Sequence, residues 1–187
     1  MLQIILIVIA VIIIAFVIVV ALRPANFRVT RSASILAPPE AVFAQVNDFH
    51  CWESWSPWAK LDPQAKNAYE GPAAGTGAAF AWSGNNKVGE GRMTITESRP
   101  NEFVGFQIQF LRPFKATNAA EFTFRREGNQ TVVSWTMSGR NNFLCKAMGL
   151  FMNCDNMIGS QFEKGLATMK SIVEAGEKES ALAGARS

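Results

Sequence analysis

The chain has 187 residues, a net charge of +3, fourteen phenylalanines, five tryptophans and a single histidine. Its basic residues are scattered rather than clustered, so the composition does not indicate a nucleic-acid-binding protein. One histidine and three cysteines without a CxxC pair do not supply the usual ligands of a zinc site, and we expect neither a metal nor a cofactor.

Residues 2–22 are the most apolar part of the chain. Seventeen of these 21 positions are Leu, Ile, Val or Phe, three are Ala, and only Gln3 is polar. A helix of this length spans about 31 Å at ~1.5 Å per residue, which matches a hydrocarbon core of ~30 Å. We therefore expect a single-pass transmembrane anchor over residues 1–24, with the lipid bilayer as its partner through residues 2–22.

A cleaved signal peptide is the alternative interpretation of this segment. Such a peptide has a positive N-terminal region, an apolar run of about 7–15 residues and a small-residue cleavage site. No Lys or Arg precedes the segment and its apolar run is longer, so we favour an uncleaved anchor in the cell membrane. Arg23, Arg28 and Arg31 follow it, and the positive-inside rule then places the C-terminal domain in the cytoplasm.

The cysteines Cys51, Cys145 and Cys154 are widely spaced. An odd number without a disulfide framework suits a reducing compartment, which agrees with a cytoplasmic domain. We interpret them as buried free thiols. A disulfide between Cys145 and Cys154 is the alternative if the compartment is oxidising.

The first element after the anchor is a strand. Residues 27–35 alternate apolar and polar side chains, which is the period of two of a strand with one buried face. Pro39 suits the first turn of a helix, which we expect to run to about Asn47. Asp48 can cap a second short helix that ends near Trp52.

Residues 69–139 have the pattern of successive antiparallel strands. Apolar side chains recur at every second position in short runs, which turn sequences rich in Gly, Asn and Pro separate. This pattern predicts a meander with one apolar and one polar face. We expect a short helix over residues 142–152 and a long amphipathic helix from about 155 to 174, capped by Asp155, before a flexible polar tail over 177–187.

This order of elements, one strand, two small helices, a meander and a long C-terminal helix, resembles the helix-grip fold. START domains, the major birch pollen allergen and bacterial polyketide cyclase/dehydrase-like proteins, together the SRPBCC superfamily, share that fold. The residues that carry the resemblance are SILAPPEAVF (34–43), VNDF (46–49), WESWSPW (52–58), Gly139 and FEKGL (162–166). The resemblance covers about residues 27–176. It implies an α+β domain over residues 25–176, in which a curved antiparallel sheet wraps around the long helix.

The helix-grip resemblance also implies a cavity between the sheet and the long helix, since such cavities bind apolar molecules in this superfamily. The inward-facing residues that we expect to line it are Trp82, Met93, Phe106, Phe110, Trp135, Met137, Phe162 and Met169. We therefore predict a monomeric, membrane-anchored binding module for a hydrophobic small molecule, lipid-like or polyketide-like. The alternatives are an enzyme of the cyclase, dehydratase or hydrolase type that uses the same cavity, and an interaction module whose core is filled.

No group of residues in the sequence identifies a nucleophile or a general base. His50 adjoins Cys51, but neighbours on a helix point apart, so we interpret His50 as a helix-end residue that does not carry catalysis. Glu90 and Arg92 share one face of a strand. We interpret them as an ion pair on the outer face, with a polar pair inside the cavity as the alternative.

Overall fold

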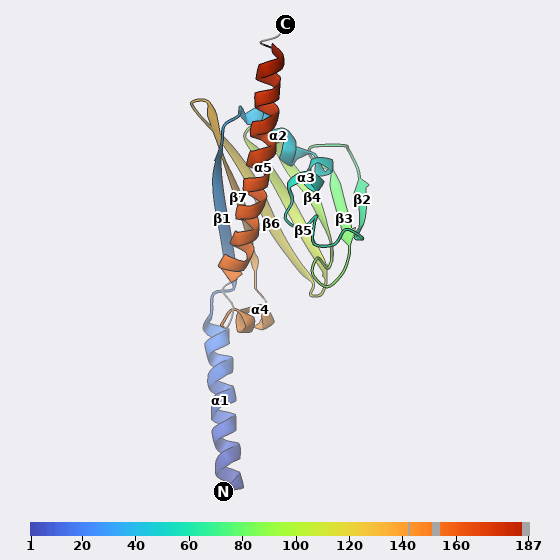
Figure 1. The fold of residues 1–187 in the computed structure, drawn as a ribbon. Coiled ribbons are helices and arrows are strands. Elements are labelled where there is room, and N and C mark those ends of the chain that lie inside the picture. The colour runs from blue at the N-terminus through green and yellow to red at the C-terminus, as the bar shows by residue number, and fades with distance from the viewer. Residues whose placement is uncertain (142, 151–153, 185–187) are drawn as a thin grey trace.

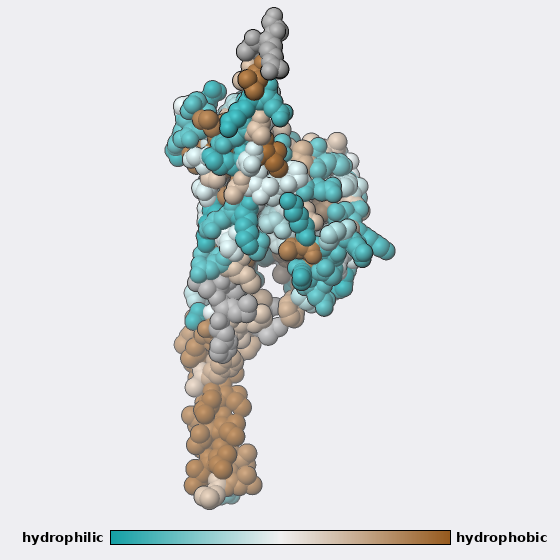
Figure 2. Space-filling model, viewed as in Figure 1, coloured by the Kyte–Doolittle hydropathy of each residue, from teal (hydrophilic) through white to brown (hydrophobic). Residues whose placement is uncertain are grey.

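The computed structural model describes residues 1–141, 143–150 and 154–184, and it contains an isolated N-terminal helix and one α+β domain (Figure 1). Helix α1 (Leu2–Leu22) extends away from the domain, and every side chain in it except Val20 is accessible to solvent. In the part of the chain that the structure describes, α1 is the one helix long and apolar enough to cross a membrane. Its surface is almost continuously hydrophobic (Figure 2).

Seven antiparallel strands form one curved sheet in the order β1-β7-β6-β5-β4-β3-β2 (Figure 1). Strands β2 to β7 follow one another in space as they do in sequence, and β1 joins the meander by pairing with β7. This arrangement confirms the predicted meander. The strands are β1 (Asn26–Ile35), β2 (Lys66–Glu70), β3 (Ala79–Ser83), β4 (Glu90–Arg99), β5 (Phe103–Arg112), β6 (Ala116–Glu127) and β7 (Gln130–Arg140).

The helices cover the inner face of the sheet. Helix α5 (Cys154–Gly184) packs along β1, and α2 (Pro39–Asn47), the 3₁₀ turn η1 (Phe49–Cys51) and α3 (Trp52–Trp55) lie over the neighbouring strands. Helix α4 (Phe143–Met148) contacts α1. A curved antiparallel sheet with a long C-terminal helix confirms the α+β helix-grip fold that the sequence predicts.

The core follows the two periodicities of the sequence. On α5, Phe162, Leu166, Met169 and Val173 recur at intervals of three and four residues, and all four are buried. They pack in one cluster with alternate residues of the strands, among them Trp135. One helical stripe and one face of the sheet therefore enclose a single core.

An ion-pair cluster fastens the start of α5 to β1. The Arg31 guanidinium donates from Nη2 to Asp155 Oδ2 at 2.8 Å and from Nε to Glu163 Oε1 at 2.7 Å. These carboxylates raise the pKa of Arg31. The guanidinium lies over Gly159, where a Cβ atom would collide with it. The expectation that Asp155 caps the helix is wrong, because Asp155 lies inside the first turn of α5 and pairs with Arg31.

The C-terminal half of α5 departs from the sequence prediction. Glu174 Oε1 accepts hydrogen bonds from the Leu36 backbone N–H and from Lys170 Nζ, both at 2.8 Å, and these donors lower the pKa of Glu174. Beyond Glu174 the helix continues through Gly184, although we expected a flexible tail from residue 177. The Glu, Lys, Ala and Leu residues of this stretch favour a helix without tertiary contacts.

Part of the connection before α5 lies outside the described residues. The predicted helix over 142–152 corresponds to α4, while residues 142 and 151–153 are not described. The side chain of Cys154 is not described either, so the alternative of a Cys145–Cys154 disulfide stays a prediction. Residues 185–187 of the predicted tail are also outside the description.

Candidate functional site

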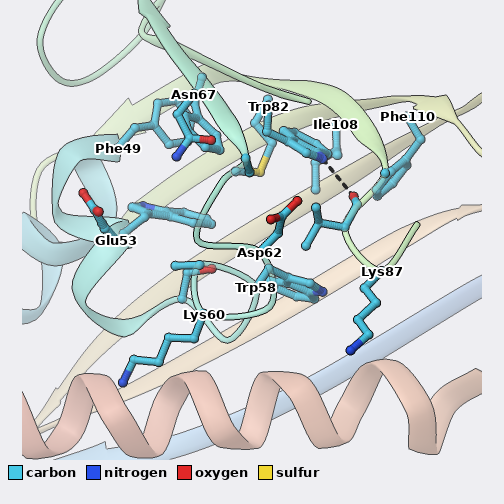
Figure 3. A pocket seen from close by; sticks show the side chains of 18 of the residues that line it. Phe49, Glu53, Trp58, Lys60, Asp62, Asn67, Trp82, Lys87, Ile108 and Phe110 are labelled. Carbon is cyan, nitrogen blue, oxygen red and sulfur yellow. Dashed lines mark hydrogen bonds between the residues drawn. The ribbon is translucent and has the colours of Figure 1, made fainter. Parts of the chain in front are cut away.

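A cavity of about 640 Å³ lies between the inner face of the sheet and the segment that follows α2 (Figure 3). This volume falls in the range of about 300–1,000 Å³ that is typical of small-molecule sites. Most of its wall is apolar, and eight of the lining residues are aromatic. The apolar lining residues include Phe49, Trp52, Trp58, Phe80, Trp82, Met93, Ile108, Phe110, Ala120, Trp135 and Met137.

Local hydrogen bonds fix the segment that forms one wall of the cavity. The Asp48 carboxylate accepts the His50 backbone N–H at 2.8 Å and begins η1, which confirms Asp48 as a cap. The indole N–H of Trp52 donates to the Val46 carbonyl and that of Trp55 to the Gln45 carbonyl, each at 3.0 Å. Both indoles can therefore be buried with their polar atoms satisfied.

The cavity is not walled by α5, although the sequence predicts that it is. Trp58 packs edge-on against Trp135, at a centroid distance of 5.7 Å, and against Phe162 on α5, at 6.3 Å. Trp135 in turn stacks on Phe162 at 4.0 Å. These rings fill the space in front of α5. None of the described residues of α5 is among those that line the cavity.

The loop after α3 and the β3–β4 turn border one end of the cavity. Trp82 Nε1 donates to the Val88 carbonyl at 3.0 Å, and its ring lies over Gly91, where a Cβ atom would overlap it (Figure 3). Asp62 holds the loop after α3 against the β3–β4 turn, because its carboxylate accepts the backbone N–H of Gln64 at 3.1 Å and of Asn85 at 2.7 Å. The loop and the turn thus form one rim.

The predicted lining residues divide into two groups. Trp82, Met93, Phe110, Trp135 and Met137 line the cavity. Phe106, Phe162 and Met169 are buried in the core and do not line it. Contact of any of these eight residues with a ligand stays a prediction.

Charged and polar groups occur at the rim rather than in the apolar interior. Lys60, Lys87 and Arg112 are exposed at the surface while also lining the cavity. Tyr69 also lines it, and partial burial together with the nearby carboxylates Glu53 and Asp48 raises the pKa of its phenol. A neutral phenol and several cations therefore border an apolar space.

His50 and Cys51 are not among the residues that line the cavity. The His50 ring is stacked on Tyr69 at a centroid distance of 4.1 Å, its Nδ1 is 2.7 Å from Asp48 Oδ1, and its side chain is 55% exposed. Burial and the Asp48 carboxylate raise the pKa of the Cys51 thiol. A raised thiol pKa disfavours the reactive thiolate.

Glu90 and Arg92 do not form the ion pair that the sequence suggests. Arg92 donates to Glu70 Oε2 at 2.7 Å across to β2, whereas Glu90 accepts from Arg112 at 2.8 Å. Neither Glu90 nor Arg92 lines the cavity. Glu90 lies directly opposite Arg112 in the register of β4 and β5, which explains its partner, and the Arg92 side chain reaches Glu70 across β3.

The sequence prediction missed the loop after α3 and the rim residues of the two turns. Lys60, Asp62, Lys87 and Arg112 are examples. The segments of Lys60, Asp62 and Lys87 lack a hydrophobic period, so periodicity could not place these residues, whereas Arg112 is the last residue of β5. The concentration of tryptophans over residues 52–58 is the sequence feature that could have placed the loop after α3 at the cavity.

Comparison with known proteins agrees with this architecture. Residues 26–174 match the family described as polyketide cyclase/dehydrase and lipid transport. The comparison with curated proteins found no match.

Several solved structures have the same fold at low sequence identity. Protein MLL2253 from Mesorhizobium loti is 14% identical with a TM-score of 0.59, covering 80% of this chain and 98% of its own. The Aha1 dimer from Colwellia psychrerythraea is 18% identical with a TM-score of 0.57 and coverages of 80% and 98%. DynU16, from the dynemicin biosynthetic locus, is 15% identical with a TM-score of 0.56 and coverages of 80% and 48%. At these identities the likeness shows the fold alone.

Proposed function

Since this chain belongs to the polyketide cyclase/dehydrase and lipid transport family, we propose that it is a membrane-anchored module that binds a hydrophobic small molecule in the cavity. The observation that carries the proposal is the cavity itself, about 640 Å³ in volume and walled largely by aromatic and aliphatic side chains. Transfer of an apolar molecule from water into such a space is favourable by about 25 cal/mol per Å² of buried surface. The ligand class is therefore lipid-like or polyketide-like.

The groups around the cavity support binding more than acid–base chemistry. Both oxygens of Asp62 accept backbone N–H groups, so this carboxylate links the loop after α3 to the β3–β4 turn. Arg112 pairs with Glu90. A general base needs access to the proton that it removes, and the Asp62 carboxylate is not free to move toward a substrate. An enzyme of the cyclase, dehydratase or hydrolase type is the alternative, and turnover of a bound molecule would establish it.

The anchor in this proposal is α1. Its side chains other than Val20 are solvent-exposed, unlike those of a core helix in a soluble domain, and its length matches the hydrocarbon thickness of a bilayer. We propose that α1 stays attached in the cell membrane and holds a monomeric domain in the cytoplasm. A tether of this kind keeps the cavity close to molecules that dissolve in lipid.

Filling the cavity provides the test of ligand binding. Ala120 lines the cavity from β6, whereas the adjacent Ala119 is exposed on the opposite face of the strand. We expect full-length wild-type and Ala119→Phe chains, purified in detergent, to retain the same small molecule after extraction and mass spectrometry. Ala120→Phe should lose it while keeping its circular dichroism spectrum. Equal retention by a folded Ala120→Phe chain would contradict the proposed site.

A further inference from the structure

The sheet topology brings two turns of the domain to the same end as α1. Strand β1 begins at this end, where Asn26 pairs with Arg140 at the end of β7. Because the strands are antiparallel and follow one another, the β5–β6 turn and the β3–β4 turn also lie at this end (Figure 1). The β6–β7 and β4–β5 turns lie at the opposite end.

The β5–β6 turn has the composition of a membrane-contacting loop. Leu111 and Phe114 leave 46% and 50% of their surfaces exposed, although both are large and apolar. Arg112 directly follows Leu111 and Lys115 directly follows Phe114, and no Asp or Glu occurs between residues 103 and 120. Exposed apolar side chains flanked by cations are suited to an interface with anionic headgroups.

A second apolar element lies at the same end. Phe143 and Met148 on α4 are 50% and 41% exposed. Lys146 of this helix donates from Nζ to the Ala21 carbonyl at 3.3 Å, next to the end of α1. The apolar surface of α1 thus continues onto α4 (Figure 2).

We propose that the β5–β6 turn, with α4, docks onto the bilayer that α1 crosses, and that this places the end of the cavity bordered by the β3–β4 turn against the membrane surface. Arg112 at the end of β5 and Pro113 in the turn line the cavity, as does Lys87 of the neighbouring β3–β4 turn. An apolar molecule can then pass from lipid to cavity with little exposure to water. This inference rests on the proposed anchoring of α1 but not on the identity of the ligand.

Site-specific photo-cross-linking in the full-length chain tests the docking. A photoreactive phenylalanine analogue replaces Phe114 in one variant, Asn129 of the distant β6–β7 turn in a second and Ile12 within α1 in a third. Asn129 is exposed, so it is a matched control at the opposite end of the sheet. Each chain is reconstituted into phosphatidylcholine vesicles that contain phosphatidylglycerol, illuminated and analysed by mass spectrometry.

We expect phospholipid adducts at positions 114 and 12 and none at position 129. Adducts at position 12 without any at 114 would overturn the docking while leaving the anchor intact. A cross-link from 114 to a second copy of the chain would assign the turn to a dimer interface and would also overturn it. Absence of adducts at position 12 would contradict the anchor itself, and the docking with it.

Discussion

Phe106 and Phe110 lie on the same face of β5, yet only Phe110 lines the cavity. We expect Phe106→Ala to destabilise the domain by roughly 3–5 kcal/mol, as is typical of a fully packed core phenylalanine. Phe110→Ala should cost about 1–2 kcal/mol, because its ring is half-buried and already borders open space. Urea unfolding of the two full-length variants in detergent measures the difference.

The same pair separates packing from ligand binding. The Phe110→Ala chain should retain less of the co-purifying molecule than the Phe106→Ala chain under conditions in which both are folded. The reverse order would mean that the ligand contacts Phe106 rather than Phe110.

Glu174 makes one part of the stability depend on pH. Its hydrogen bonds lower its pKa from the ordinary value of 4.5, so this carboxylate stabilises the folded chain above that value. The contribution is lost as the pH falls through the lower, folded-state pKa. We expect Glu174→Gln to lower the unfolding midpoint at neutral pH and to approach wild type in acid.

Thermal unfolding at a series of pH values measures this convergence. Glu179→Gln, on the exposed C-terminal extension of α5, is the matched control and should follow wild type throughout. A difference in unfolding midpoint between Glu174→Gln and wild type that stays constant with pH would show that Glu174 does not make the stability depend on pH.

Two glycines of α5 show how the helix is attached to the sheet. Replacing glycine by alanine within a helix is ordinarily stabilising by about 1 kcal/mol. A Cβ at Gly176 meets no atom within 4 Å, so Gly176→Ala should give this full gain. At Gly159 the new methyl group would displace the Arg31 guanidinium and weaken its pairs with Asp155 and Glu163. We expect Gly159→Ala to raise the unfolding free energy by less than Gly176→Ala does, or to lower it.

The elements themselves were predictable because each has its own hydrophobic period. Alternation along β1 and β4 to β7 and the three–four spacing on α5 give the meander and the amphipathic helix directly. The cluster around Arg31 was not predictable, because Asp155 lies 124 positions away in the sequence. The extension of α5 beyond residue 174 was missed because polarity suggested fraying while helix propensity favoured continuation.

The position of the cavity depends on the whole molecule rather than on any element. Alternation identified inward-facing side chains, but it could not distinguish those that fill the core from those that border a void. Trp58 separates the cavity from α5, because it packs between the cavity and Phe162. It belongs to a segment without a regular hydrophobic period, so the sequence did not predict this position. Five of the predicted lining residues therefore face the cavity, while Phe106, Phe162 and Met169 are enclosed by packing.

If α1 is an uncleaved anchor, the intact chain should sediment with membranes and resist high salt and alkaline carbonate. Apolar residues insert at roughly −0.3 to −0.6 kcal/mol each, so extraction should require detergent. Deleting residues 1–24 should release the domain into the soluble fraction. A soluble wild-type chain with a new N-terminus near Arg23 would establish the signal-peptide interpretation instead.

The orientation of the chain depends on charges at the end of α1. Arg23 follows the helix directly, and Arg140 and Lys146 are held near it by β7 and α4. Positive residues close to a membrane span are retained on the cytoplasmic side. A reporter fused after residue 187 should therefore report the cytoplasm. Gln3→Lys combined with Arg23→Gln should shift part of the population to the opposite orientation, and a wild-type reporter on the outer side would overturn the assignment.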